Sequence, residues 1–171
     1  MKPQTKAGVH SMTRAAIIAA IYCLLTVIFQ PVSFGAVQFR VAEALTLLPI
    51  ITPDAVPGLF VGCLIANLLG GGIWYDVVLG SIATLLAALA VRALRNRLHI
   101  AAAMPAIFNG LIIGPVVYFA YVRAPGAPVS WPVLLSSMVT VAIGEVVVCY
   151  VLGIIVVRAL HHVPEKYLIR R

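Results

Sequence analysis

The sequence predicts an all-α integral membrane protein, with six transmembrane helices in a single bundle over residues 1–171 and both termini in the cytoplasm. Of the 171 residues, 63% are hydrophobic and 10% are charged, and the mean hydropathy is +1.09. A soluble domain carries about 25% charged residues, so this composition excludes an ordinary soluble fold. The apolar residues also form long runs, and a helix needs about 20 of them to cross a bilayer.

Proline and glycine divide the apolar sequence into helices. The runs that we interpret as helices cover residues 13–30, 42–52, 55–69, 76–94, 100–121 and 133–160. The first stops at Pro31, because proline cannot continue a helix, and it lacks a cleavage site, so we expect a retained helix rather than a signal sequence. The second is short and contains Pro49; it is either kinked or begins near Phe39. The fifth contains Pro105 and Pro115.

The distribution of basic residues sets the expected orientation. With six helices and a cytoplasmic amino terminus, every Lys and Arg except Arg40 and Arg123 falls on the cytoplasmic side. Cytoplasmic loops of membrane proteins are enriched in Lys and Arg, and an odd number of helices would remove this asymmetry. Contact with anionic lipid head groups accounts for the basic side, so no nucleic-acid partner is expected.

A pair of opposite charges at the start of the second apolar run is the first sign of a binding site. Arg40 and Glu43 are three residues apart, which places them on one face of a helix and close enough to pair. In lipid, such charges are tolerated only where they face protein, water or a ligand. We interpret this stretch as one wall of a binding site.

The other polar residues of the predicted helices extend this set, with Asn67 and Asp76 near the outer surface and Asn109 and Glu145 near mid-depth. The candidate substrate-binding residues are Arg40, Glu43, Asn67, Trp74, Tyr75, Asp76, Asn109 and Glu145. A charge at the bilayer centre costs about 2.5–3.5 kcal/mol on insertion scales, so Glu145 must point inward or be neutralised. Two plainer interpretations stay open: the polar groups form only hydrogen bonds between helices, and the aromatic residues form an interfacial belt.

Small residues four apart on the first helix form a second candidate surface. The candidate partner-binding residues are Ala15, Ala16, Ala19 and Ala20. Such a stripe lets another helix approach closely, so it serves either a partner or internal packing. The pairs Gly58/Gly62 and Gly110/Gly114 have the same spacing.

Several kinds of chemistry are not predicted. No G-x-x-x-x-G-K-[ST] motif occurs, so the chain is not expected to hydrolyse ATP by itself. All the histidines fall at the predicted cytoplasmic edges, away from the outer acids, which argues against a catalytic or metal site. We therefore expect no enzyme activity, metal or other cofactor. Six helices without a visible inverted repeat are also few for a self-sufficient transporter.

Four stretches resemble a known family. F-R-V-A-E-A-L-T-L-L-P (residues 39–49), P-G-L-F-V-G-C-L-I-A-N-L-L-G-G (57–71), D-V-V-L-G-S-I-A-T-L-L-A-A (76–88) and V-A-I-G-E-V-V-V-C-Y-V-L-G (141–153) are similar to the queuosine-precursor transporter family, QueT. These proteins are substrate-binding S components of energy-coupling factor (ECF) transporters. The likeness covers nearly the whole chain.

The resemblance implies a membrane subunit that captures a 7-deazaguanine such as preQ1, preQ0 or queuine from outside. It also implies docking on a transmembrane coupling protein driven by two ATPase subunits, with Ala16 and Ala20, together with Ala15 and Ala19, offered to the coupling protein. Binding from outside is then followed by tilting of the whole subunit in the membrane.

The polar cluster suits such a ligand. A guanine-type edge offers two adjacent N–H donors to one carboxylate, and a cationic aminomethyl arm favours a second. We expect two of Glu43, Asp76 and Glu145 to take these parts and Arg40 to orient Glu43. The remaining roles are for Asn67 and Asn109 to read the carbonyl and ring nitrogens, Trp74 or Tyr75 to cover the ring, and residues 32–38 to act as a lid.

Three other functions remain open from the sequence. The same class of protein could bind another small heterocycle or a vitamin. An intramembrane enzyme could use Glu43, Asp76 or Glu145 as an acid or base. A purely structural helical subunit would bind no ligand.

Overall fold

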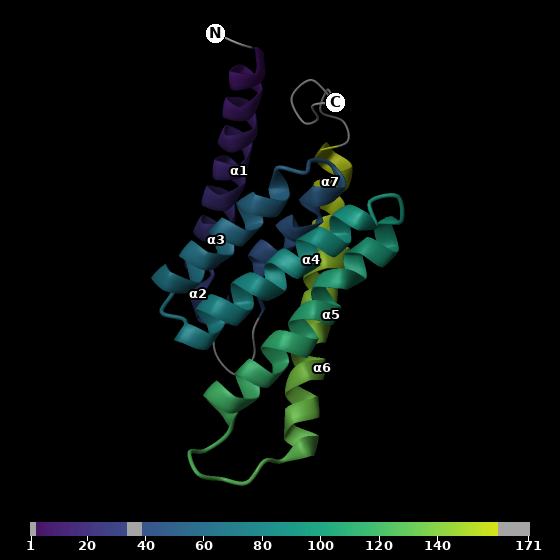
Figure 1. The fold of residues 1–171 in the computed structure, drawn as a ribbon. Helices are drawn as coiled ribbons and strands as arrows, with labels where there is room; N and C mark the ends of the chain where they lie inside the picture. The colour runs from purple at the N-terminus through teal and green to yellow at the C-terminus, as the bar shows by residue number, and fades with distance from the viewer. Residues whose placement is uncertain (1–2, 34–38, 161–171) are drawn as a thin grey trace.

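The computed structural model describes residues 3–33 and 39–160, and this part of the chain is helical with short connections (Figure 1). The elements are α1 (Pro3–Ile28), α2 (Gln30–Ser33), η1 (Val41–Ile50), α3 (Ala55–Leu69), η2 (Asp76–Gly80), α4 (Ser81–Ala93), α5 (Leu98–Val117), η3 (Tyr118–Val122), α6 (Trp131–Val147), η4 (Val148–Gly153) and α7 (Ile154–Leu160). The segments η2–α4, α5–η3 and α6–η4–α7 are each continuous in sequence, which gives the six long helical segments that the sequence predicts, with the four-residue α2 as an extra turn.

Four of these segments are long and apolar enough to span a membrane. They are Gly8–Ile28, Asp76–Ala93, Leu98–Val122 and Trp131–Leu160. The other two, Val41–Ile50 and Ala55–Leu69, are apolar but shorter. The prediction of an all-helical membrane protein is thus confirmed for the described residues, and the sidedness of the termini stays a prediction.

The second segment is a 3-10 helix in the middle of the bundle. Residues Ala42 to Pro49 of η1 are all buried, so this helix has no face exposed to lipid. A 3-10 helix rises about 2.0 Å per residue, so the ten residues of η1 extend about 20 Å. The sequence was compatible with either a kinked helix or a helix that begins near Phe39. The structure instead resolves the ambiguity with tighter winding, and Pro49 lies inside the helix.

Prolines occur both at helix starts and within helices of this bundle. α1 ends at Ile28, but Pro31 does not stop the chain from being helical, because it lies inside the short helix α2; Pro105 and Pro115 likewise lie inside α5 without ending it. After Pro115 the chain continues as the π-helical turn η3. α6 begins at Trp131 rather than at the predicted residue 133, because the first turn of a helix accommodates proline.

Glycines bring two pairs of helices into close contact. A Cβ on Gly62 of α3 would lie 2.9 Å from Ala19 Cα of α1, and a Cβ on Gly114 of α5 would lie 2.5 Å from Met138 Cα of α6. Only a residue without a side chain permits such an approach. These contacts join α1 to α3 and α5 to α6 side by side.

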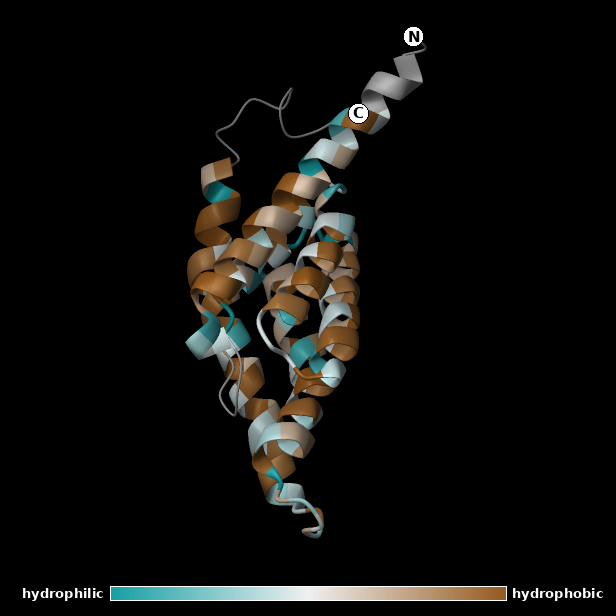
Figure 2. Cartoon of the chain, turned by 90° about the vertical axis from the view of Figure 1, so that its left-hand side faces the viewer, coloured by the Kyte–Doolittle hydropathy of each residue, from teal (hydrophilic) through white to brown (hydrophobic). Residues whose placement is uncertain are grey.

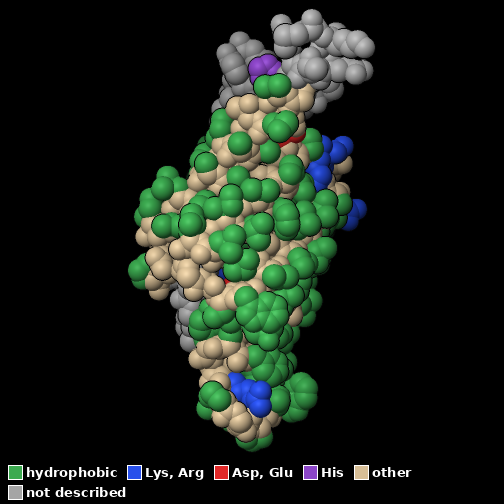
Figure 3. Space-filling view, turned by 60° about the vertical axis from the view of Figure 1, so that its left-hand side comes forward, with side chains coloured by type: hydrophobic (Ala, Val, Ile, Leu, Met, Phe, Trp, Pro, Cys, Tyr) green, Lys and Arg blue, Asp and Glu red, His purple; other side chains and the backbone are tan. Residues whose placement is uncertain are grey.

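The surface is that of a protein in lipid. Hydrophobic residues cover most of the helices in Figure 2, and large apolar side chains such as Met12, Leu69 and Ile155 are exposed. The start of α1 and the end of α7 lie at the same end of the molecule (Figure 1). Basic side chains gather toward the two ends, with a broad hydrophobic belt between them (Figure 3). Such a belt is typical of a protein that is embedded in a bilayer.

Candidate functional site

A cluster of polar side chains lies inside the bundle where η1, η2, α3, α5 and α6 meet. Its members from the predicted set are Arg40, Glu43, Asn67, Asp76, Asn109 and Glu145. Their relative exposure ranges from 0% for Glu43 to 6% for Glu145. Glu and Asp are almost never fully buried unless they are paired, so this burial marks the cluster as a site of special chemistry.

Glu43 is held by neighbours from two other helices. The hydroxyl of Tyr22 on α1 donates a hydrogen bond of 2.5 Å to Glu43 Oε1, and Thr84 on α4 donates to the same oxygen at 3.5 Å. Thr84 also contacts Cys63 Sγ at 3.3 Å. These contacts fix the position of Glu43 Oε1 and so define the orientation of the carboxylate.

Asp76 lies at the junction of α3, η2 and η3. Tyr121 donates a hydrogen bond of 2.6 Å to Asp76 Oδ2, while Asn67 Nδ2 donates to the backbone carbonyl of Asp76 at 2.8 Å. Gly80, one turn further along, packs against the same group: a Cβ there would lie 2.9 Å from Asn67 Nδ2 and 3.6 Å from Arg40 Nη1. Glycine at position 80 therefore lets Asn67 and Arg40 reach the cluster.

Glu145 completes the cluster from α6. Asn109 Nδ2 on α5 donates a hydrogen bond of 2.8 Å to Glu145 Oε1. Glu145 also interacts electrostatically with Glu43 and Arg40, and Arg40 in turn with Asp76. One guanidinium thus faces three carboxylates in a region shielded from water.

Four oxygens of the cluster stay free to accept a hydrogen bond. Among the residues that the structure describes, the buried side-chain oxygens without a hydrogen-bond partner are Glu43 Oε2, Asn67 Oδ1, Asp76 Oδ1 and Glu145 Oε2. Leaving a buried acceptor unsatisfied costs about 1–3 kcal/mol, and more for a charged group. The cluster is therefore suited to a bound molecule that brings several donors.

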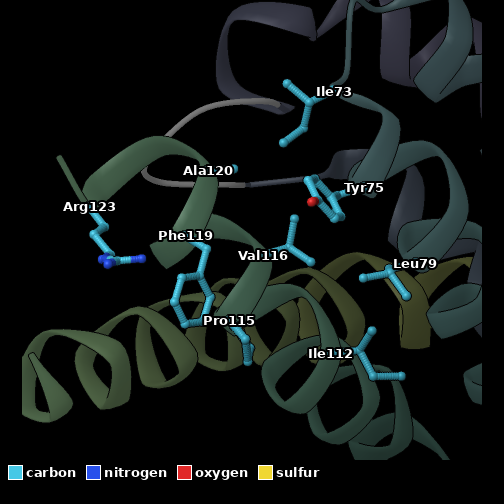
Figure 4. Close-up of a pocket in the computed structure, with 9 residues that line it drawn as sticks. All are labelled: Ile73, Tyr75, Leu79, Ile112, Pro115, Val116, Phe119, Ala120 and Arg123. Carbon is cyan, nitrogen blue, oxygen red and sulfur yellow. The ribbon is translucent and has the colours of Figure 1, made fainter. Parts of the chain in front are cut away.

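The structure places two predicted residues outside this cluster. Trp74 and Tyr75 stack on each other with ring centroids 3.8 Å apart, and their relative exposures are 65% and 46%. Tyr75 lines an apolar surface groove of about 540 Å³ between η2 and the α5–η3 segment, with Arg123 at its edge (Figure 4). Trp74 and Tyr75 are adjacent to Asp76 in sequence, but their side chains lie on the surface rather than in the buried cluster.

Three residues of the cluster were not predicted. Tyr22, Thr84 and Tyr121 supply the hydroxyls that hold Glu43 and Asp76. Tyr121 falls near the end of a predicted helix, where tyrosine is ordinary in an interfacial belt. A tyrosine inside an apolar run, as at position 22, was the one signal that could have drawn attention to the buried face of α1.

The alanine stripe is divided between two faces of α1. Ala15 and Ala19 pack on α3, where a Cβ on Gly58 would lie 2.7 Å from the Ala15 carbonyl oxygen. Ala16 and Ala20 are exposed. Half of the stripe therefore serves internal packing, and the other half remains available to a partner. The expected lid falls mostly on residues 34–38, outside the described residues.

Comparison with known proteins places the chain among transporters. A family model described as QueT transporter matches residues 12–162. The queuosine precursor transporter QueT of Lactococcus lactis subsp. cremoris (strain MG1363) is 33% identical over 82 residues, which cover 47% of this chain and 48% of that protein. The alignment thus spans about half the length of this curated relative. No solved structure matches. The family match includes every residue of the cluster, from Tyr22 to Glu145.

Proposed function

Because this chain belongs to the QueT transporter family, we propose that it is the substrate-binding membrane subunit of an ECF-type importer and captures a queuosine precursor from outside the cell. The chain is a multi-pass membrane protein, and its relative is named as a queuosine precursor transporter. The observation that carries the proposal is the group of four buried acceptor oxygens in one cluster. The ligand is a 7-deazaguanine, whose ring edge and arm supply the missing donors.

The proposed contacts follow from the hydrogen-bonding atoms that each side chain leaves without a protein partner. Asp76 Oδ1 and Asn67 Oδ1 lie at the η2 end of the cluster and accept from the N–H donors of the guanine-type edge. Arg40 orients the neighbouring carboxylates, because it interacts electrostatically with both Glu43 and Asp76. Tyr22 and Tyr121 hold those carboxylates in place. Trp74 and Tyr75, being exposed, are assigned no contact with the ring.

The predicted orientation supports the proposal of capture from outside. Asp76 opens η2, which follows the carboxyl end of α3, whereas the Arg14–Asp54 ion pair, whose Nη2–Oδ2 distance is 2.6 Å, lies at the amino end of α3. In Figure 1 the amino end of α3 and the basic α4–α5 turn both lie toward the end of the bundle at which α1 begins. With the basic end in the cytoplasm, the η2 end of the cluster lies toward the exterior.

Replacing the carboxylates by amides tests the site. We expect Glu43→Gln, Asp76→Asn and Glu145→Gln each to weaken binding of a 7-deazaguanine by about ten- to a hundredfold, since a hydrogen bond to a charged group contributes about 1.5–3 kcal/mol. The measurement is isothermal titration of the full chain in lipid nanodiscs. Mass spectrometry of solutes that co-purify with the protein identifies the natural ligand independently.

Asp54→Asn is the matched control, because it makes the same chemical change at the other end of α3. Its affinity should equal that of the unaltered protein. If all three cluster variants also bind the deazaguanine with unchanged affinity, the cluster is not the binding site. If a different heterocycle co-purifies and binds more tightly, the site is retained and the substrate is corrected.

The exposed alanines of α1 are the proposed contact with the coupling protein. We expect Ala16→Leu with Ala20→Leu to abolish uptake driven by the ATPase subunits while ligand binding stays unchanged, because the bulky side chains separate two closely packed helices. Uptake of radiolabelled ligand into proteoliposomes and titration of the isolated chain measure the two effects. As a contrast, Ala19→Leu faces Gly62 and should lower stability instead. Normal uptake by the Ala16/Ala20 variant would exclude this face as the docking surface.

A further inference from the structure

Acidic side chains outnumber basic ones in the cluster. Glu43, Asp76 and Glu145 are buried, and Arg40 is the one basic side chain among the described residues that is buried with them. Asp54 forms an ion pair with Arg14 elsewhere in the bundle. Uncompensated charge in a low-dielectric interior is costly, so the site is best balanced by a ligand that brings a positive charge.

The excess is concentrated at the pair formed by Glu43 and Glu145. Each carboxylate uses Oε1 to accept from protein donors: Tyr22 and Thr84 for Glu43, and Asn109 for Glu145. Each leaves Oε2 without a hydrogen-bond partner. The two carboxylates interact electrostatically across the cluster, and both are at least nine-tenths buried.

An ammonium group matches this pair in charge and in the donors it offers. It presents three N–H donors and no acceptor, so it can donate to Glu43 Oε2 and Glu145 Oε2 at once. Asp76, which is held by Tyr121 at the η2 end, is left to bind the ring edge. A neutral arm would satisfy at most part of this demand and leave the like charges unscreened.

We infer that the site selects 7-deazaguanines whose arm carries a protonated amine over neutral congeners, and that Glu43 and Glu145 bind the ammonium. This inference rests on the proposed function, since it assumes that a deazaguanine occupies the cluster. It assigns the arm and the ring edge to different carboxylates, which can be tested separately.

Three ligands with the same ring test the selection: the aminomethyl, hydroxymethyl and nitrile 7-deazaguanines. The hydroxymethyl compound matches the aminomethyl compound in size but is neutral. We expect the aminomethyl compound to bind at least about tenfold more tightly than either neutral one, because hydrogen bonds between ionised groups are roughly twice as strong as neutral ones. The measurement is titration of the full chain in nanodiscs at neutral pH.

Variants separate the arm from the ring edge. Glu145→Gln and Glu43→Gln should reduce the aminomethyl preference toward unity while the nitrile compound still binds, which also shows that the variants are folded. Asp76→Asn should weaken all three ligands by the same factor and keep the preference. Asp54→Asn should change neither quantity.

Each remaining outcome decides against the inference. If the neutral ligands bind as tightly as the aminomethyl compound and Asp76→Asn weakens all of them, the site binds deazaguanines without charge selection. If the preference survives in both Glu43→Gln and Glu145→Gln, other groups bind the arm. If none of the three ligands binds, the proposed function fails and the inference fails with it.

Discussion

Replacing Arg40 by methionine is expected to destabilise the protein by about 3–5 kcal/mol and to abolish ligand binding, because it removes the buried cation that faces Glu43, Asp76 and Glu145. Methionine keeps an unbranched, flexible stem without the charged guanidinium. The free energy of unfolding is measured by denaturant titration in bicelles, and binding by titration in nanodiscs.

A second substitution separates charge from packing. If Arg40 acts by compensating carboxylates, Arg40→Met combined with Glu43→Gln should be more stable than Arg40→Met alone, since the buried charge is again reduced. Arg123→Met is the matched control: Arg123 is half-buried and bonds the Ala127 carbonyl in the connection before α6. A double variant no more stable than Arg40→Met would show that Arg40 acts through its shape.

Much of the fold follows from the sequence because lipid imposes strict conditions. Only helices satisfy every backbone group in hydrocarbon, so long apolar runs fix the spanning segments. Residues 55–69 were predicted with the observed bounds of α3. The winding of η1 was not predictable in the same way. Its burial on all sides removes the amphipathic period that distinguishes one kind of helix from another.

The polar core of the site was predictable for the same reason. A carboxylate such as Glu145 or an amide such as Asn109 within an apolar run must face inward, and the structure brings the two together. Aromatic residues in such a run do not have to face inward. Trp74 is exposed, as tryptophans at a membrane interface commonly are, whereas Tyr22 is buried against Glu43. The rotation of each helix in the bundle decides which of these two environments an aromatic side chain enters.

The contact between α5 and α6 leads to the second large effect, which concerns packing rather than charge. Gly114→Leu is expected to lower the free energy of unfolding by about 3 kcal/mol or more, at or beyond the upper end of the usual cost of overpacking. A Cβ at this position would lie 2.5 Å from Met138 Cα and 2.7 Å from Met138 Cγ. Because a backbone atom is the obstacle, the two helices must move apart.

The cost of separating these helices should also reach the site, since α5 carries Asn109 and α6 carries Glu145. We therefore expect Gly114→Leu to weaken ligand binding although it lies outside the cluster. Gly8→Leu is the control, because a Cβ there meets no atom within 4 Å and leucine favours a helix more than glycine does. A Gly114→Leu protein that unfolds at the same denaturant concentration as the Gly8→Leu protein would mean that α5 and α6 do not depend on this close approach. The position of Asn109 against Glu145 would then depend on the neighbouring close approach at Gly110, where a Cβ would lie 3.1 Å from Ala142 Cβ.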